Sequence, residues 1–169
     1  MQNRKTNFAF IDGTNLHLTM QNTGWRLDYL KFRIYLKDKF RISRAYYFIG
    51  KIPGNEDIYN NLESCGYTLI YKPTLLVPGK GYKGNCDAEL VLQAMITFGD
   101  YEKAVIVTSD GDFGCLVEYL SKEKKLEKVI APRREGCSIL LRKAAGPKID
   151  YIDNLKTKLE YAGRRRSTP

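Results

Sequence analysis

The stretch Ala104-Val105-Ile106-Val107-Thr108, followed by Ser109-Asp110-Gly111-Asp112, decides the fold class of this chain. A continuous apolar run of this length, rich in β-branched residues, is typical of a β-strand. The Asp-Gly-Asp sequence that follows is a turn signal, and apolar residues at helical spacing then occupy residues 113–120. We therefore predict a strand that leads through an acidic turn into a helix.

The same alternation extends in both directions from this stretch. Strands are predicted at residues 8–11, 45–49, 67–71, 129–131 and 149–152, and further helices around residues 27–34, 58–65, 86–98 and 138–145. Residues 75–83, with Pro78-Gly79 at their centre, indicate a loop or hairpin. Strands that alternate with helices indicate βαβ units, so we expect an α/β fold with a mainly parallel central sheet flanked by helices in three layers.

Two of the predicted helices carry specific expectations about burial. Asp28 is a plausible N-cap, and the apolar residues Leu27, Leu30 and Ile34 recur at helical spacing around it. The helix at residues 86–98 is apolar on most of its circumference, so we expect neighbouring elements to cover it well.

Length and composition restrict the class of protein. The chain has 169 residues, of which 43% are hydrophobic and 12% aromatic, which suits one globular domain and excludes intrinsic disorder. We expect a single domain over residues 1–160, followed by a basic, disordered tail over residues 161–169. No apolar run is long enough for a membrane span and no signal-peptide pattern precedes the first strand, so a cytoplasmic location is expected.

The chain is basic, with 28 Lys and Arg against 19 Asp and Glu and a formal charge of +9. Such a balance suits a nucleic acid or an anionic membrane, but no amphipathic anchor accompanies the charge, so membrane binding is not expected. The four cysteines form no Cys-x-x-Cys pair and there is one histidine, which excludes a zinc cage and favours buried, reduced thiols.

Acidic residues follow the predicted strands. Asp12 ends the first strand, and Asp110 and Asp112 follow the strand at residues 104–108. Ligands of open parallel sheets bind at the carboxyl ends of the strands, so these carboxylates converge if the two strands are neighbours. Converging carboxylates repel one another unless a cation such as Mg²⁺ binds them. Asp87 is a fourth candidate, because it lies on the inward stripe of its helix.

Each acid also has a simpler explanation when it is taken alone. Asp12 fits a turn, Asp87 fits the first turn of a helix, and Asp110 and Asp112 fit a turn followed by an N-cap. The occurrence of all four at strand ends and a helix start favours a metal site.

Three segments resemble the NYN domain of the LabA-like group, within the PIN-like nuclease superfamily. They are Phe10-Ile11-Asp12-Gly13-Thr14-Asn15, Lys83-Gly84-Asn85-Cys86-Asp87 and Val107-Thr108-Ser109-Asp110-Gly111-Asp112-Phe113, and the similarity covers residues 6–152. The resemblance implies a PIN-like Rossmannoid sheet and RNA cleavage that depends on Mg²⁺ or Mn²⁺. It also implies that Asp12, Asp87, Asp110 and Asp112 are the acidic set, with Asn15 as the polar residue of the first segment. Many members of the group carry another acid where this chain has Gln93, which leaves a second metal ligand open.

Candidate substrate contacts lie around these acids. Thr14 and Asn15, at the start of a helix, can donate to the scissile phosphate, and Ser109 can add a contact unless its hydroxyl bonds its own turn. Basic and aromatic residues interleave over residues 71–83, so Lys72, Lys80 and Lys83 suit a single strand, although a solvated hairpin explains them equally well. Arg133 and Arg134 follow a strand at the same sheet edge, and residues 164–166 form a basic arm.

The expected function is endonucleolytic cleavage of RNA, with single-stranded RNA as the favoured substrate and DNA left open. The alternative is a non-catalytic RNA-binding or regulatory module on the same fold. An aspartyl phosphatase is less favoured, because Thr14 occupies the position where the second acid of a D-x-D motif is required. A homodimer is left open.

Overall fold

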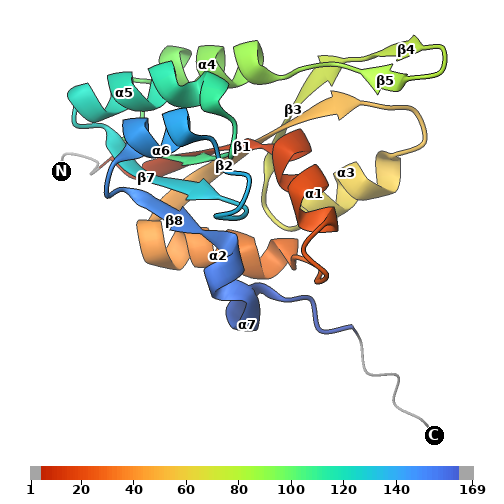
Figure 1. The fold of residues 1–169 in the computed structure, drawn as a ribbon, viewed down its shortest axis with the longest axis horizontal. Helices are drawn as coiled ribbons and strands as arrows, with labels where there is room; N and C mark the ends of the chain where they lie inside the picture. The colour runs from red at the N-terminus through yellow and green to blue at the C-terminus, as the bar shows by residue number, and fades with distance from the viewer. Residues whose placement is uncertain (1–4, 164–169) are drawn as a thin grey trace, which may run out of the picture.

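The computed structural model describes residues 5–163, and its centre is a six-stranded sheet with the order β3-β2-β1-β6-β7-β8 (Figure 1). All neighbouring strands in this sheet are parallel, which confirms the predicted fold class. Its strands are β1 (Asn7–Asp12), β2 (Ile42–Lys51), β3 (Thr68–Pro73), β6 (Ala104–Val107), β7 (Leu126–Ala131) and β8 (Ile149–Tyr151).

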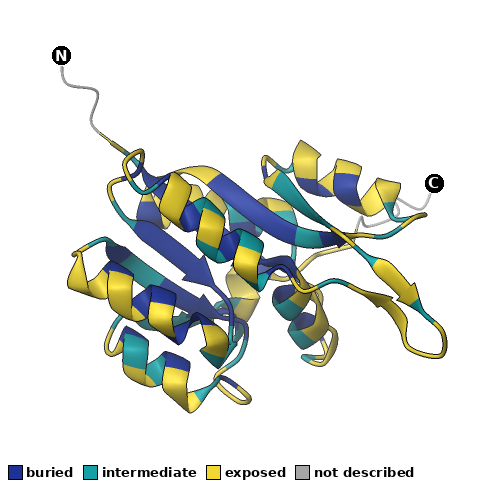
Figure 2. Ribbon diagram, turned by 90° about the horizontal axis from the view of Figure 1, so that it is seen from above, coloured by how far each residue is buried: buried dark blue, intermediate teal, exposed yellow. Residues whose placement is uncertain are grey.

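Helices cover both faces of the sheet and so form the outer two layers (Figures 1 and 2). One face carries α4 (Asp87–Ile96), α5 (Gly114–Lys122) and α6 (Ile139–Ala145), and the other carries α1 (Gly13–Gln21), α2 (Tyr29–Phe40), α3 (Glu56–Ser64) and α7 (Lys156–Leu159). The side chains of β1 alternate between these layers, with Phe10 in the first core cluster and Ile11 in the second. Because β1 is buried on both faces, its four central residues are all apolar.

The order of the strands changes direction beside β1. The chain continues from β1 to β2 and β3 on one side, whereas β6, β7 and β8 lie on the other. The register pairs Ile11 with Val107, so β1 and β6 end side by side. This is the topological switch point at which open parallel sheets bind ligands.

The predicted hairpin is present as β4 (Leu75–Val77) and β5 (Gly81–Lys83). It projects from the body of the protein and is largely exposed (Figure 2). Its turn contains Gly79 at φ 72°, a left-handed conformation that favours glycine. The hairpin leads directly into α4, whose first residue is Asp87.

The burial of α2 differs from the sequence prediction. Asp28 is the N-cap as expected, because its Oδ1 accepts a 3.0 Å hydrogen bond from the Lys31 N–H. The predicted stripe is correct only for Leu27, which is buried, since Leu30 and Ile34 are half exposed. The buried residues are Phe32, Leu36 and Phe40, which are spaced four apart and place two aromatic rings in the core.

The prediction that α4 is well covered is also wrong. Leu90 and Ala94 are buried against the sheet, but Leu92 and Ile96 are more than half exposed. Helix α4 is an outer-layer helix, so one face contacts the sheet and the opposite face meets solvent whatever its composition (Figure 2).

The cysteines, the lengths of the apolar helices and the C-terminal residues were also the subject of sequence predictions. The four thiols were expected to be buried; Cys86 and Cys137 are buried, whereas Cys65 is half-buried and Cys115 is exposed. No helix among residues 5–163 is long and apolar enough to cross a membrane. Residues 161–163 are exposed, and the predicted arm at residues 164–166 lies outside the described part of the chain.

Candidate metal centre

Three carboxylates meet near the switch point of the sheet. Asp87, Asp110 and Asp112 each offer an oxygen, and these oxygens lie within 4.8 Å of one another. We call these three residues the acid cluster. Asp110 and Asp112 follow β6, where the Asp110 Oδ1 accepts a 2.9 Å hydrogen bond from the Asp112 N–H and so starts the short 3₁₀ helix η1 (Gly111–Phe113). Asp87 comes from the opposite side, at the first turn of α4.

Asn85 holds Asp87 in place from two residues earlier in the chain. Its Oδ1 accepts a 2.7 Å hydrogen bond from the Asp87 N–H, and its Nδ2 donates a 2.9 Å hydrogen bond to the Asp87 Oδ2. The pKa of Asp87 is raised, chiefly because burial disfavours its charge, while the Asn85 hydrogen bond lowers it and the charges of Asp110 and Asp112 raise it. Asn85 received no role from the sequence, although an asparagine just before a helix is a known capping signal.

Asp12 lies behind the acid cluster rather than within it. Its side chain is buried, and its Oδ1 and Oδ2 accept hydrogen bonds from the Asn15 N–H at 3.2 Å and from the Thr108 hydroxyl at 3.0 Å. Burial raises its pKa to about 6, although both hydrogen bonds oppose the shift, and the nearby charges of Asp87 and Asp110 raise the pKa further. Asp12 therefore lies next to the acid cluster and is not one of its three members.

Thr108 joins the two strand ends and was missed by the sequence analysis. Its hydroxyl donates to Asp12 and accepts a 3.1 Å hydrogen bond from the Asp110 N–H. The side chain is fully buried, so each polar atom needs a partner. The sequence contained one signal for this role, because Thr108 is the first polar residue after an apolar strand and lies two residues before Asp110.

Asn15 makes a second connection between the same two segments. Its Oδ1 accepts hydrogen bonds from both the N–H and the hydroxyl of Ser109, each at 2.9 Å. The Ser109 hydroxyl thus bonds across the site and not within its own turn. Asn15 and Ser109 fix the position of the loop that carries Asp110.

The residues predicted to contact the substrate differ in whether their side chains are paired within the protein or exposed to solvent. Lys72 forms an ion pair with Glu89, which lowers the pKa of Glu89 and turns both side chains toward each other. Lys80 and Lys83 are exposed on the hairpin, and Thr14 is exposed on the first turn of α1. Of these four predicted contacts, Thr14, Lys80 and Lys83 therefore face solvent, whereas Lys72 is paired with Glu89.

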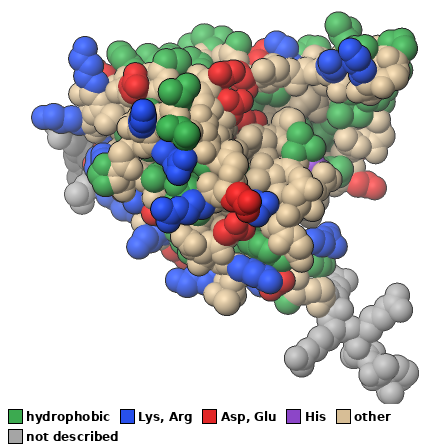
Figure 3. Space-filling view, viewed as in Figure 1, with side chains coloured by type: hydrophobic (Ala, Val, Ile, Leu, Met, Phe, Trp, Pro, Cys, Tyr) green, Lys and Arg blue, Asp and Glu red, His purple; other side chains and the backbone are tan. Residues whose placement is uncertain are grey.

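The two predicted arginines also differ in their surroundings. Arg133 forms ion pairs with Glu135 at 2.9 Å and with Asp153 at 3.4 Å, so its charge is already offset. Arg134 is exposed, and its guanidinium lies 5.9 Å from the centre of the Tyr151 ring. Figure 3 shows Lys and Arg side chains scattered over one face of the molecule, with acidic side chains in small groups among them.

The donor set of the acid cluster fits a hard divalent cation. Three carboxylates in such proximity repel one another, and a cation of the Mg²⁺ or Mn²⁺ type relieves that repulsion. These ions prefer carboxylate, carbonyl and water oxygens, and no histidine or cysteine belongs to the cluster. A cation held by these three carboxylates would place positive charge at one point near the ends of β1 and β6.

The raised pKa of Asp12 predicts that Asp12→Asn stabilises the metal-free protein at neutral pH. A shift from 3.8 to about 6 corresponds to about 3 kcal/mol, and the altered Thr108 hydrogen bond offsets about 1 kcal/mol of it. Since the pKa is raised in the folded state, stability falls as pH rises from about 4 to about 6 and the effect is complete above that range. Urea unfolding in EDTA should show a gain of about 2 kcal/mol at pH ~7 that disappears near pH ~4.

Asp38→Asn, at an exposed acid on α2, is the matched control and should change the free energy of unfolding by less than about 0.5 kcal/mol. A loss of stability in Asp12→Asn at neutral pH would show that the buried charge is not a source of instability.

The fold and the acid cluster together define a Rossmann-like α/β domain with an acidic site at the switch point of its sheet. The chain belongs to the NYN domain family, whose family model matches residues 8–152. It is 31% identical over 121 residues to the Low amplitude and bright protein LabA of Synechococcus elongatus, a match that covers 66% of this chain and 65% of that protein.

A solved structure supports the same fold. A protein of unknown function from Vibrio parahaemolyticus superposes with a TM-score of 0.74 at 20% identity, over 95% of this chain and 99% of that one. The matched region spans less than two thirds of the LabA relative, so the similarity to LabA concerns this domain.

Proposed function

We propose that the protein is a divalent-metal-dependent endoribonuclease that cleaves single-stranded RNA. The observation that carries the proposal is the convergence of Asp87, Asp110 and Asp112 at the switch point of a parallel sheet. Membership of the NYN family supports nuclease chemistry at this position. The net charge of +9 supports a polyanionic substrate.

The protein residues contribute position and charge. Asp87, Asp110 and Asp112 would hold the cation, which supplies Lewis acidity to phosphoryl oxygens and makes a bound water a better nucleophile. Asp12 and Asn85 keep this cluster in place through the hydrogen bonds to Thr108 and Asp87. Thr14, exposed at the start of α1, is placed to donate to a phosphate oxygen of the substrate.

The hairpin β4–β5 is the proposed guide for the strand. Lys80 and Lys83 are exposed, as is Tyr82, which can stack on a base. The hairpin continues into α4 through Gly84 and Asn85, so a strand that lies along it is led toward Asp87. Single-stranded RNA suits this surface better than a duplex, because stacking requires bases that are not paired.

The function is tested with labelled single-stranded RNA and DNA of the same sequence, incubated with the protein and with Mg²⁺, Mn²⁺, Ca²⁺ or EDTA. We expect cleavage of the RNA within the chain in Mg²⁺ or Mn²⁺ and none in EDTA. DNA that is cut as fast as RNA would reassign the substrate class.

RNA that is bound in a salt-dependent manner but remains intact in every metal would overturn the proposed activity. That outcome favours a non-catalytic RNA-binding module, for which Gln93 in α4 is the relevant departure from the acidic pattern of the family.

A further inference from the structure

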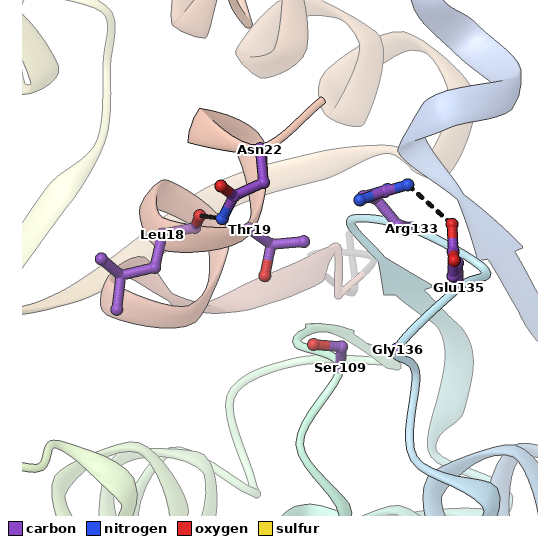
Figure 4. A pocket seen from close by; sticks show the side chains of 7 residues that line it. All are labelled: Leu18, Thr19, Asn22, Ser109, Arg133, Glu135 and Gly136. Carbon is purple, nitrogen blue, oxygen red and sulfur yellow. Dashed lines mark hydrogen bonds and ion pairs between the residues drawn. The ribbon is translucent and has the colours of Figure 1, made fainter. Parts of the chain in front are cut away.

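A cleft of about 300 Å³ opens on the α1 side of Ser109 (Figure 4). It is lined by three segments that are far apart in the sequence: the last turn of α1, the loop after β6 and the loop after β7. The lining residues are Leu18, Thr19, Asn22, Ser109, Arg133, Glu135 and Gly136. A cleft of this size is at the small end of ligand sites, which suits a single nucleoside.

The charges at the cleft disfavour a phosphate as its occupant. Arg133 is the only cation in the lining, and its guanidinium is paired with Glu135 at 2.9 Å and Asp153 at 3.4 Å. Two carboxylates therefore offset one positive charge, and an added anion would meet net negative charge. The cleft is suited to a neutral, polar group.

Several polar atoms in the lining have hydrogen-bonding capacity to spare. The Asn22 Nδ2 donates to the Leu18 carbonyl at 3.1 Å, while the Asn22 Oδ1 and the Thr19 hydroxyl have no hydrogen-bond partner among residues 5–163. The Ser109 hydroxyl donates to Asn15 and can still accept. The Leu18 side chain points away from the other lining residues (Figure 4). The hydroxyl groups of Thr19 and Ser109 match the ribose hydroxyls of a nucleoside.

The cleft adjoins the acid cluster through Ser109. Ser109 lines the cleft and immediately precedes Asp110, so their Cα atoms are about 3.8 Å apart. Asn15 fixes this junction, because it accepts two hydrogen bonds from Ser109. A nucleoside in the cleft would thus lie next to a phosphate at the acid cluster.

We propose that this cleft binds one ribonucleoside unit of the RNA, adjacent to the scissile phosphate, and that Thr19 and Ser109 bind its ribose hydroxyls. The proposal rests on the proposed ribonuclease function for its place in catalysis. The site selects RNA because the 2′-hydroxyl, which DNA lacks, supplies both a donor and an acceptor to these side chains.

The test is an NMR titration of the full chain, labelled with ¹⁵N, in EDTA. The probes are adenosine, uridine, their 2′-deoxy counterparts and inorganic phosphate. We expect the ribonucleosides to shift the backbone amide signals of Thr19, Asn22, Ser109 and Gly136, with weaker binding of the deoxynucleosides. Shifts from phosphate alone would overturn the proposal, as would equal affinity for the ribo and deoxy forms or an absence of shifts with every nucleoside.

Thr19→Val removes the hydroxyl and keeps the shape of the side chain, so we expect about three- to tenfold weaker ribonucleoside binding. Thr157→Val, at an exposed threonine on α7, is the matched control and should bind as the wild type does. Unchanged binding in Thr19→Val, with the amide spectrum of a folded protein, would remove Thr19 from the proposal and overturn the ribose assignment.

Nucleoside binding is measured without metal and without cleavage, so the two proposals can fail separately. Ribonucleoside shifts in a protein that cleaves nothing would overturn the nuclease function and leave the cleft assigned. Cleavage of RNA by a protein whose amide signals do not shift with nucleosides would support the nuclease function and overturn the assignment of the cleft.

Discussion

Asp110→Asn is expected to lower the rate of RNA cleavage by about 100-fold or more, because it removes a charged ligand from the acid cluster. Asparagine retains an oxygen that can accept the 2.9 Å hydrogen bond from the Asp112 N–H, so the turn at η1 should survive. The rate is measured on labelled single-stranded RNA at saturating Mn²⁺, and folding is checked by thermal melting.

Asp38→Asn is the matched control for this variant, since Asp38 is an exposed acid on α2, which covers the opposite face of the sheet from α4. It should cleave as the wild type does. If Asp110→Asn cleaves RNA at the wild-type rate, the acid cluster does not support catalysis.

Gly13→Ala is expected to destabilise the fold by about 3 kcal/mol or more, because no space exists for the added methyl group. A Cβ at this position would lie 2.2 Å from Cε1 of Tyr47 and 2.5 Å from the carbonyl oxygen of Phe48, and both residues belong to the buried strand β2. Neither neighbour can move easily, since Tyr47 is enclosed and the second contact is to backbone. The loss is measured as the free energy of unfolding in urea.

Gly99→Ala is the control for the loss of glycine as such, because a Cβ at Gly99 meets nothing within 4 Å. It should alter stability by less than about 1 kcal/mol. Equal stabilities for the two variants would show that α1 can shift away from β2. They would also show that the Asp-Gly pair at the end of β1 serves only as a turn.

The order of elements was predictable from the sequence because the strands are short apolar runs between turn signals. β6 and the acidic turn after it are the clearest example, and the helix that follows buries Phe113, Leu116 and Val117 as the spacing indicated. The faces of the outer helices were less predictable. Composition alone suggested that α4 was covered, but only packing against a neighbouring element decides which apolar side chains are buried. Leu92 and Ile96 are more than half exposed.

The sequence predicted which acids lie near the site, but it did not predict which of them are buried and which are exposed. The sequence placed Asp12 and Asp110 at strand ends, and the β1–β6 pairing that makes these ends adjacent is a tertiary property. Asp12 is buried and Asp112 is exposed, and no local sequence pattern distinguishes the two. Thr108 was missed for the same reason, since a threonine at a strand end is ordinary until its hydroxyl is found between two loops.

Lysines and arginines were the least predictable residues of the site. Lys72 and Arg133 were expected at the substrate, yet each pairs with a carboxylate of the protein. Glu89 is only two residues beyond Asp87 in the sequence, but it faces Lys72 and not the acid cluster. Long charged side chains choose partners by three-dimensional proximity, so their roles follow from the fold and not from spacing.

The central claim is that Asp87, Asp110 and Asp112 form a divalent-metal site. It is tested most directly by titrating the metal-free protein with Mn²⁺ and following the free ion by electron paramagnetic resonance, in the wild type and in Asp110→Asn. We predict saturable binding by the wild type and at least about tenfold weaker binding by the variant, since one of three charged ligands is lost. Equal Mn²⁺ binding by the two proteins would contradict the claim.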